Sequence, residues 1–218
     1  MPKGFFITFE GTEGCGKSTQ VEFLARNLAA LGHRVRTLRE PGGSPIGEEI
    51  RHTLKHSKAN QAMTPEAELL LMNASRAQLV REIIRPSLAN GEIVVCDRFY
   101  DSTTAYQGYG RQLDLKMVET IVNVAVEDTR PDLTLLLVIP PDVSELRRAF
   151  RQSTMPFMRD RLEEGDRQFF ARVARGYEVI AAAEPGRVRV LDGAGSVENI
   201  CGKIWEIVQP RLPKVGRW

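Results

Sequence analysis

The sequence has few cysteines, and their positions form no known pattern. Cys15, Cys96 and Cys201 lie far apart, so they have neither the paired spacing of a zinc site nor the even number of a disulfide framework. Long apolar runs are also missing. The longest one, 133–139, is far shorter than a membrane span, and Glu10 ends the apolar start too early for a signal peptide. We therefore expect reduced thiols, a cytoplasmic location and no membrane partner.

The chain also has little net charge. Its formal charge is +2 over 218 residues, and it lacks the strongly basic stripe that nucleic-acid-binding proteins usually carry. This balance predicts no nucleic-acid partner, but it does not exclude a small anionic ligand, which needs only a few local cations. With 42% hydrophobic and 27% charged residues, the composition is typical of a globular protein, and we expect one domain over 1–218.

Short apolar runs alternate with longer segments of helical periodicity. The runs predict buried strands at 5–9, 35–38, 93–96, 133–139 and 188–191. The longer segments predict helices near 17–31, 46–56, 66–89, 114–127, 142–151, 166–183 and 196–208. Strands that alternate with helices predict an α/β fold with three layers, in which helices cover both faces of a five-stranded parallel sheet.

Charged residues or glycines follow three of these strands. The first strand runs into Glu10 and Gly11, the second into the segment 39–43, and the third into Asp97 and Arg98. In parallel sheets ligands bind beyond the carboxyl ends of the strands. Because these ends meet at one edge, the sequence predicts a binding site there.

The strongest motif begins where the first strand ends. It reads Gly11-Thr12-Glu13-Gly14-Cys15-Gly16-Lys17-Ser18 and fits the P-loop pattern G-x-x-x-x-G-K-[ST] in full. In such a loop the backbone N–H groups face phosphate oxygens, Lys17 reaches the β and γ phosphates, and the Ser18 hydroxyl binds Mg²⁺. We expect Thr19 to extend this phosphate-binding set. The alternative is a glycine-rich turn that only caps a helix, and the motif by itself does not say which reaction follows.

Asp97 and Arg98 close the third strand beside the P-loop edge. We expect the acid to orient Mg²⁺ through water or to steer an acceptor, and the arginine to clamp a phosphate with two hydrogen bonds. A surface ion pair at a strand end is the alternative. The position beside the P-loop favours the catalytic interpretation.

Arginines are concentrated between Leu146 and Leu162, at Arg147, Arg148, Arg151, Arg159 and Arg161. One interpretation is a solvated basic turn. The other is a short lid at about 150–162 whose arginines close on the transferring phosphate and stabilise its charge. The P-loop contains no arginine, so a cation for the γ-phosphate must come from elsewhere, which favours the lid.

Several short motifs, in order and at matching spacing, resemble those of the bacterial thymidylate kinase family over nearly the whole chain. They are Phe9-Glu10-Gly11-Thr12-Glu13-Gly14, Arg39-Glu40-Pro41-Gly42-Gly43, Ser75-Arg76-Ala77-Gln78, Asp97-Arg98-Phe99, Ala105-Tyr106-Gln107-Gly108 and Asp160-Arg161-Leu162-Glu163. The resemblance implies a P-loop fold, transfer of the ATP γ-phosphate to dTMP with Mg²⁺, and a homodimer. It implies no covalent enzyme intermediate.

The resemblance also implies roles for single residues on the donor side. Lys17 would contact the transferring phosphate, and Ser18 and Asp97 would hold the metal. Arg147 and the loop at Asp192 would flank the adenine, and Arg151 would be the lid cation. We expect Arg148, its neighbour, to point to solvent.

On the acceptor side, Arg98 and Arg51 would bind the dTMP phosphate, and Glu13 would contact the sugar 3′-hydroxyl or a metal-bound water. The residues expected around the base and sugar are Arg76 and Thr103 on the thymine edge, Gln107 behind it, and Tyr106 where a ribose 2′-hydroxyl would lie.

This chain departs from the family pattern at two positions. Met72 stands where the family usually stacks a phenylalanine on thymine, and Val138 stands where the fourth strand usually ends in aspartate. Methionine covers a ring more weakly and less rigidly. The rival functions are another nucleoside monophosphate kinase on the same scaffold and a P-loop switch that binds ATP without transferring phosphate.

Overall fold

The computed structural model describes residues 4–154, 161 and 165–213, and at 151, 152 and 154 it describes the backbone alone. Within these residues, five strands form one parallel sheet in the order β2-β3-β1-β4-β5. Their bounds are β1 (Phe5–Glu10), β2 (Val35–Arg39), β3 (Ile93–Asp97), β4 (Leu133–Val138) and β5 (Val188–Asp192). The parallel sheet predicted from the apolar runs is confirmed.

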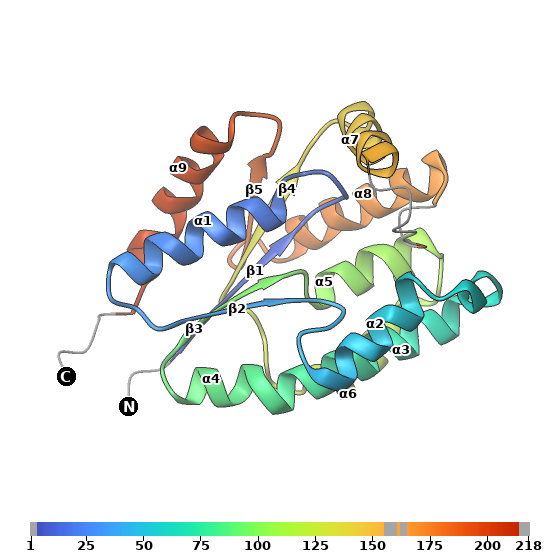
Figure 1. Ribbon diagram of the computed structural model, residues 1–218, viewed down its shortest axis with the longest axis horizontal. Helices are drawn as coiled ribbons and strands as arrows, with labels where there is room; N and C mark the ends of the chain where they lie inside the picture. Colours follow the sequence, from blue (N-terminus) through green and yellow to red (C-terminus); the bar gives the residue numbers. More distant parts are fainter. Residues whose placement is uncertain (1–3, 155–160, 162–164, 214–218) are drawn as a thin grey trace.

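Helices cover both faces of the sheet (Figure 1). The α-helices are α1 (Lys17–Ala30), α2 (Pro45–Lys55), α3 (Pro65–Leu79), α4 (Arg85–Ala89), α5 (Tyr100–Thr103), α6 (Leu115–Val126), α7 (Pro141–Thr154), α8 (Arg167–Ala183) and α9 (Val197–Val208). Shorter 3₁₀ and π-helical segments are η1 (Lys58–Ala62), η2 (Val80–Ile84), η3 (Thr104–Gly110) and η5 (Gln209–Arg211). None of the helices in the described ranges is long and apolar enough to cross a lipid bilayer.

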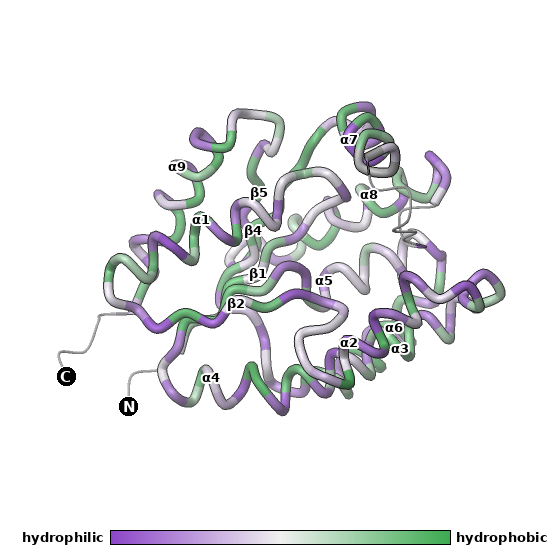
Figure 2. The backbone as a smooth tube through the Cα atoms, viewed as in Figure 1, coloured by the Kyte–Doolittle hydropathy of each residue, from purple (hydrophilic) through white to green (hydrophobic). Residues whose placement is uncertain are grey.

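The central strand β1 supports both helical layers because its side chains alternate between the two faces. Ile7 and Phe9 pack in the cluster that includes α1 and α9. Phe6 packs in the cluster that includes α3 and α6. All three side chains are fully buried. Figure 2 shows hydrophobic residues gathered on the central strands and hydrophilic residues on the outer turns of the helices.

The strand register places the expected site residues at one edge. Phe9 of β1 and Arg39 of β2 both lie opposite Asp97 of β3. The residues that follow these three positions therefore leave the sheet together. These are the P-loop, the segment 40–43 and Arg98, as the sequence predicts.

The sequence pattern does not predict the helical stretch formed by α5 and η3. Its residues are largely polar and end in glycines, a composition typical of a loop. Glycines on both sides permit close packing, since a Cβ on Gly110 of η3 would lie 2.6 Å from the Phe169 ring and one on Gly176 of α8 would lie 2.8 Å from the Tyr109 ring. Packing against α8 therefore stabilises a helix that local preference does not favour.

Candidate active site

The P-loop connects β1 to α1 through glycines in the left-handed region. Gly11 and Gly14 have φ values of 132° and 77°, which L-side chains rarely adopt. Space is limiting too, because a Cβ on Gly11 would lie 2.2 Å from the Leu137 carbonyl oxygen and one on Gly14 would lie 2.9 Å from the Arg147 Cβ. The loop ends at Gly16, the N-cap of α1, where helical N–H groups favour an anion.

Lys17 and Ser18 follow at the start of α1. The Lys17 ammonium donates to the carbonyls of Gly11 at 3.1 Å and Thr12 at 2.9 Å, so it is held over the loop. The Ser18 hydroxyl donates to Asp97 Oδ2 at 2.6 Å. Oxygen ligands of this kind suit Mg²⁺. Since no three His, Cys, Asp or Glu side chains of the described chain are grouped to hold a metal, a cation here would also need phosphate oxygens or water.

Helix α7 covers the P-loop. Ser144 donates to the Glu13 carbonyl at 2.8 Å, and Arg147 donates to the Gly14 carbonyl at 2.8 Å. The arginine expected near the adenine therefore lies against the phosphate-binding loop. The Arg151 side chain, Arg159 and most of the expected lid at 150–162 fall outside the described residues.

The expectation that Arg148 points to solvent is wrong. Its guanidinium carbon lies 3.8 Å from the centroid of the Phe170 ring, and the side chain is half-buried. A guanidinium over an aromatic face is attracted by the ring quadrupole. Phe170 comes from α8, a long-range contact that the local sequence does not reveal.

Two adjoining cavities open at this edge of the sheet. The P-loop cavity has a volume of about 360 Å³ and is lined by Gly14, Gly16, Lys17, Ser18, Thr19, Arg39, Arg51, Asp97 and Arg147. The inner cavity, of about 40 Å³, is lined by Pro41, Met72, Arg76, Ser102, Thr103, Tyr106 and Gln107. Four residues line both and form the wall between them: Glu13, Glu40, Lys55 and Arg98.

Arg98 has a φ of 72°, which is uncommon for a residue with a side chain. Three hydrogen bonds fix this turn. Arg98 N donates to the Phe9 carbonyl at 2.9 Å, Phe99 N donates to Glu10 Oε1 at 2.8 Å, and the Cys96 thiol donates to the Arg98 carbonyl at 3.1 Å. The turn directs the arginine into the shared wall of the cavities.

The Arg98 guanidinium is the centre of a polar network. It donates to Glu13 Oε1 at 2.6 Å, and to the hydroxyls of Ser102 at 2.9 Å, Tyr177 at 3.2 Å and Tyr106 at 3.3 Å. The arginine expected to bind a phosphate is thus paired with a carboxylate in this structure. An incoming phosphate would compete with Glu13 for the same N–H groups.

Glu13 also accepts a hydrogen bond from the Tyr106 hydroxyl. Burial opposes ionisation, but the positive charges of Arg98 and Lys17 outweigh it and hold the pKa of Glu13 below its ordinary value. The side chain is therefore a carboxylate at neutral pH.

Glu10 supports the Arg98 network from behind. It is fully buried and accepts from Ser102 at 2.6 Å and from Tyr177 at 2.9 Å, the same hydroxyls that contact Arg98. Burial, together with the negative charge of Asp101, raises the pKa of Glu10 to about 7.

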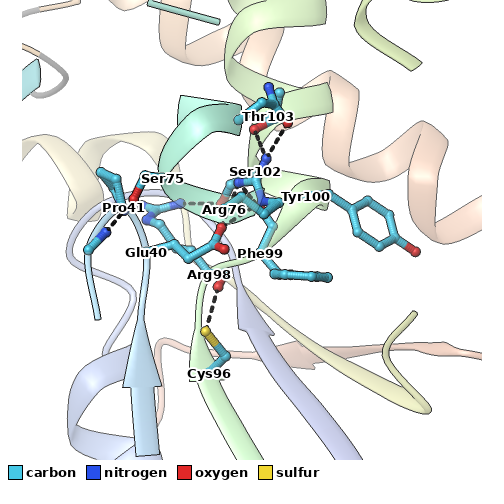
Figure 3. A network of polar contacts seen from close by, with 12 residues as sticks. Glu40, Pro41, Ser75, Arg76, Cys96, Arg98, Phe99, Tyr100, Ser102 and Thr103 are labelled. Atoms are coloured by element: carbon cyan, nitrogen blue, oxygen red, sulfur yellow. Dashed lines mark hydrogen bonds and ion pairs between the residues drawn. The ribbon is translucent and has the colours of Figure 1, made fainter. Parts of the chain in front are cut away.

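Arg76 projects from α3 into the inner cavity, where Figure 3 shows its polar network. It is 2% exposed and pairs with Glu40 at 2.6 Å. It also donates to Asn73 at 2.9 Å, to the Thr103 hydroxyl at 2.8 Å and to the Phe99 carbonyl at 3.2 Å. With a further hydrogen bond from Nε to Glu40 at 2.7 Å, protein groups accept from all three nitrogens of the guanidinium. Burial outweighs the neighbouring Arg76 charge and raises the pKa of Glu40.

The remaining residues expected at the base and sugar also line the inner cavity. Met72 is 8% exposed and packs against Leu54. Gln107 donates to Glu68 at 2.8 Å, and Glu68 in turn accepts from Arg111 at 3.0 Å. These contacts fix Gln107 from outside the cavity.

Two further positions lie at the margins of the site. Arg51 lines the P-loop cavity and donates to the Pro41 carbonyl at 2.7 Å. Asp192 lines neither cavity. It accepts from the Ala194 backbone at 2.9 Å, and its neighbour Gly193 approaches the Cys15 carbonyl so closely that a Cβ there would lie 3.1 Å away. Val138 lies beside Asp192 in the sheet and is 46% exposed.

Several residues that shape the site have no role predicted from the sequence. Glu40 stands directly after β2. Charged residues at the carboxyl ends of parallel strands are expected at the binding edge, and this rule suffices to predict a role for Glu40 as it does for Asp97. Lys55 lies one helical turn after Arg51, a spacing that places both on one face. Ser102 and Tyr177 carry no local signal, because their positions depend on the packing of α8 against α5 and η3.

The chain matches a family model described as thymidylate kinase over residues 9–204. It is 45% identical over 215 residues to a thymidylate kinase of Geobacter sp. strain M21, and the matched region covers 98% of this chain and 95% of that protein. It is 46% identical over 202 residues to one of Syntrophotalea carbinolica, covering 92% of this chain and 93% of the relative. Its structure resembles that of thymidylate kinase from Ehrlichia chaffeensis with a TM-score of 0.75 and 31% identity, over 95% of this chain and 99% of the other.

Proposed function

The chain belongs to the thymidylate kinase family, and we infer that it transfers the ATP γ-phosphate to dTMP, giving ADP and dTDP. The observation that carries this inference is the pair of adjoining cavities. One is built from a P-loop and suits the donor phosphates. The other is smaller, is lined by the buried Arg76 and suits an acceptor base. Because the cavities adjoin and share four lining residues, a donor in one and an acceptor in the other would have their phosphates next to each other, as a direct transfer requires.

We propose the following roles for the P-loop cavity. Lys17 contacts the transferring phosphate. Ser18 and Asp97 hold Mg²⁺, which would neutralise charge on the donor phosphates. The N–H groups of the loop from Gly11 to Gly16 bind the phosphates, and Thr19 extends this set. Because the reaction transfers a group between two anions, these residues act by positioning and by balancing charge.

For the acceptor, we propose that Arg98 exchanges Glu13 for the dTMP phosphate, with Arg51 beside it. Glu13 would then turn toward the sugar 3′-hydroxyl or a metal-bound water. In the inner cavity, Arg76 and Thr103 would contact the thymine edge. Their existing bond to one another, at 2.8 Å, would be exchanged for bonds to the base.

Four further roles remain proposals drawn from the family resemblance. Tyr106 would exclude a 2′-hydroxyl, and Gln107 would support the base. Arg147 with the loop at Asp192 would flank the adenine. Arg151 would supply the cation that the P-loop lacks.

We also propose that 1–218 forms one catalytic domain and that the protein works as a homodimer in the cytoplasm. Helices α3 and α6 pack together, and each exposes an apolar side chain: Leu70 is 56% exposed and Val124 is 70% exposed. Burial of such residues favours association. Sedimentation of the purified chain would test the dimer.

A panel of nucleoside monophosphates with Mg-ATP tests the function. We expect dTMP to be the preferred acceptor, and the release of ADP measures product formation. Preference for a purine or cytosine acceptor would instead support another monophosphate kinase. Binding of ATP without saturable dTMP binding would support a P-loop switch.

A further inference from the structure

Lys55 holds a position that none of the roles above includes. It is the last residue of α2, one helical turn after Arg51, so the two side chains lie on the same side of that helix. Both line the P-loop cavity, and Lys55 also lines the inner cavity. A long side chain with an apolar stem and a charged tip can contact both regions at once.

The charge of Lys55 acts on the shared wall. It is among the positive charges that lower the pKa of Glu13, together with Arg98 and Lys17. Glu13 forms an ion pair with Arg98 at 2.6 Å. The Lys55 charge is therefore felt at the point where Arg98 meets its carboxylate partner.

Because one of its two carboxylates is paired with an arginine outside the wall, the wall has one cation in excess before any ligand binds. It contains the carboxylates Glu13 and Glu40 and the cations Lys55 and Arg98, while Glu40 is already paired with Arg76. A phosphate group that binds Arg98 brings further negative charge close to Glu13. Another cation beside the two anions attracts both of them, and this attraction offsets their mutual repulsion.

We propose that Lys55 is a further binding residue for the acceptor, with its ammonium on the acceptor phosphate beside Arg98 and its stem against the sugar and base. This inference rests on the proposed function, because the ligand it requires is a nucleoside monophosphate. It adds a third cation to Arg98 and Arg51 at the phosphate end of the acceptor.

The matched variants are Lys55→Met and Lys58→Met. Methionine keeps most of the stem and removes the charge, and Lys58 is an exposed lysine of η1 that lines neither cavity. The measurement is the dissociation constant of dTMP and of thymidine, by calorimetry and without ATP. Thymidine carries the same base and sugar but no phosphate.

For Lys55→Met we expect dTMP to bind about tenfold more weakly, the effect of losing one hydrogen bond to a charged group. Thymidine should bind with a change of less than about twofold, since the stem remains. Lys58→Met should leave both constants unchanged. Lys55→Arg should retain dTMP affinity within about threefold, because it keeps a cation at the same place.

Two results would overturn the inference. Unchanged dTMP affinity in Lys55→Met would show that the ammonium does not contact the phosphate. Equal weakening of dTMP and thymidine would show that Lys55 acts on the base or sugar alone. A wild-type protein that binds no dTMP would instead overturn the proposed function, so the two failures are distinguishable. Equal urea midpoints for the variants check that the fold is intact.

Discussion

Two arginines of the site, Arg76 in the inner cavity and Arg98 at the shared wall, are each paired with a carboxylate, but the two pairs differ in exposure. In the inner cavity, Arg76 and Glu40 are each nearly inaccessible, at 2% and 3% side-chain exposure, and protein groups accept hydrogen bonds from all three nitrogens of the arginine. At the shared wall, Arg98 and Glu13 are 16% and 10% exposed, and both line cavities. The comparison indicates that the Arg76 pair preserves the shape of a pocket, whereas the Arg98 pair is poised to exchange one anion for another.

The largest effect is expected for Lys17, in the P-loop cavity, where a phosphate would replace protein partners. Within the described part of the chain, the Lys17 ammonium donates to two loop carbonyls and to the Cys15 sulfur, so a phosphate would replace weak partners. Lys17→Ala should lower kcat by roughly 10³-fold or more, because a preorganised cation on a transferring phosphate is a large part of catalysis. A coupled ADP assay measures the loss, and circular dichroism confirms the fold. Near-normal turnover would contradict the assignment.

The second prediction compares how much stability is lost when the carboxylate of each ion pair is replaced. Glu40→Leu should lower the free energy of unfolding by roughly 3–5 kcal/mol, because it leaves the buried Arg76 charge uncompensated. Glu13→Gln should lower it by less than about 2 kcal/mol, since hydroxyls and solvent still contact Arg98. Urea denaturation of both variants gives the two values. Equal losses would remove the distinction between a fixed and an exchangeable arginine.

The sequence predicted the P-loop side of this comparison well. A P-loop motif, strand ends that converge on one edge and an arginine after the third strand are local signals, and the structure brings those residues together. The five strands were predicted for the same reason, since apolar runs that are buried on both faces need no knowledge of distant partners.

The inner side was less predictable. The pairing of Arg76 with Glu40 joins α3 to the end of β2. Outside the inner cavity, the stacking of Arg148 on Phe170 joins α7 to α8 in a similar way. Such contacts are set by how helices pack, not by neighbours along the chain. The α5 and η3 stretch was missed for this reason, because its helical state depends on contact with α8.

A third test uses pH to probe the support beneath Arg98. The pKa of Glu10 is about 7 in the folded protein against 4.5 for the ordinary group. Between these values the folded state binds more protons than the unfolded state. The contribution of Glu10 to stability is therefore fully present below pH 4.5 and is lost as pH rises through about 7.

Glu40 has a raised pKa as well and acts in the same direction, so the comparison must be made between wild type and Glu10→Gln. The free energy of unfolding of wild type should fall relative to that of Glu10→Gln by roughly 1 kcal/mol per pH unit in this interval. Urea titrations from pH 5 to 8 measure the difference. Parallel curves would show that Glu10 titrates alike in both states.

The smallest effect concerns Met72, which stands in the inner cavity where the family usually has a phenylalanine. Met72 packs against Leu54 and is 8% exposed, so part of its surface faces the cavity. A phenylalanine ring would stack on a base with fixed geometry, whereas a thioether adapts and holds it less firmly. Met72→Phe should therefore tighten dTMP binding by roughly 0.5–1.5 kcal/mol.

This increase in affinity comes from stacking on the base, so thymidine should bind more tightly by the same amount. The effect expected for Lys55→Met, in contrast, depends on the phosphate. Met63→Phe is the matched control, because Met63 packs in the same cluster but lines neither cavity. Added volume in that cluster costs about 1–3 kcal/mol of stability at either position, and urea denaturation measures it separately from binding. Weaker dTMP binding in Met72→Phe, with stability equal to that of the control, would mean that the base does not lie against this side chain. The selectivity of the inner cavity for its base would then rest on the polar residues Arg76, Thr103 and Gln107.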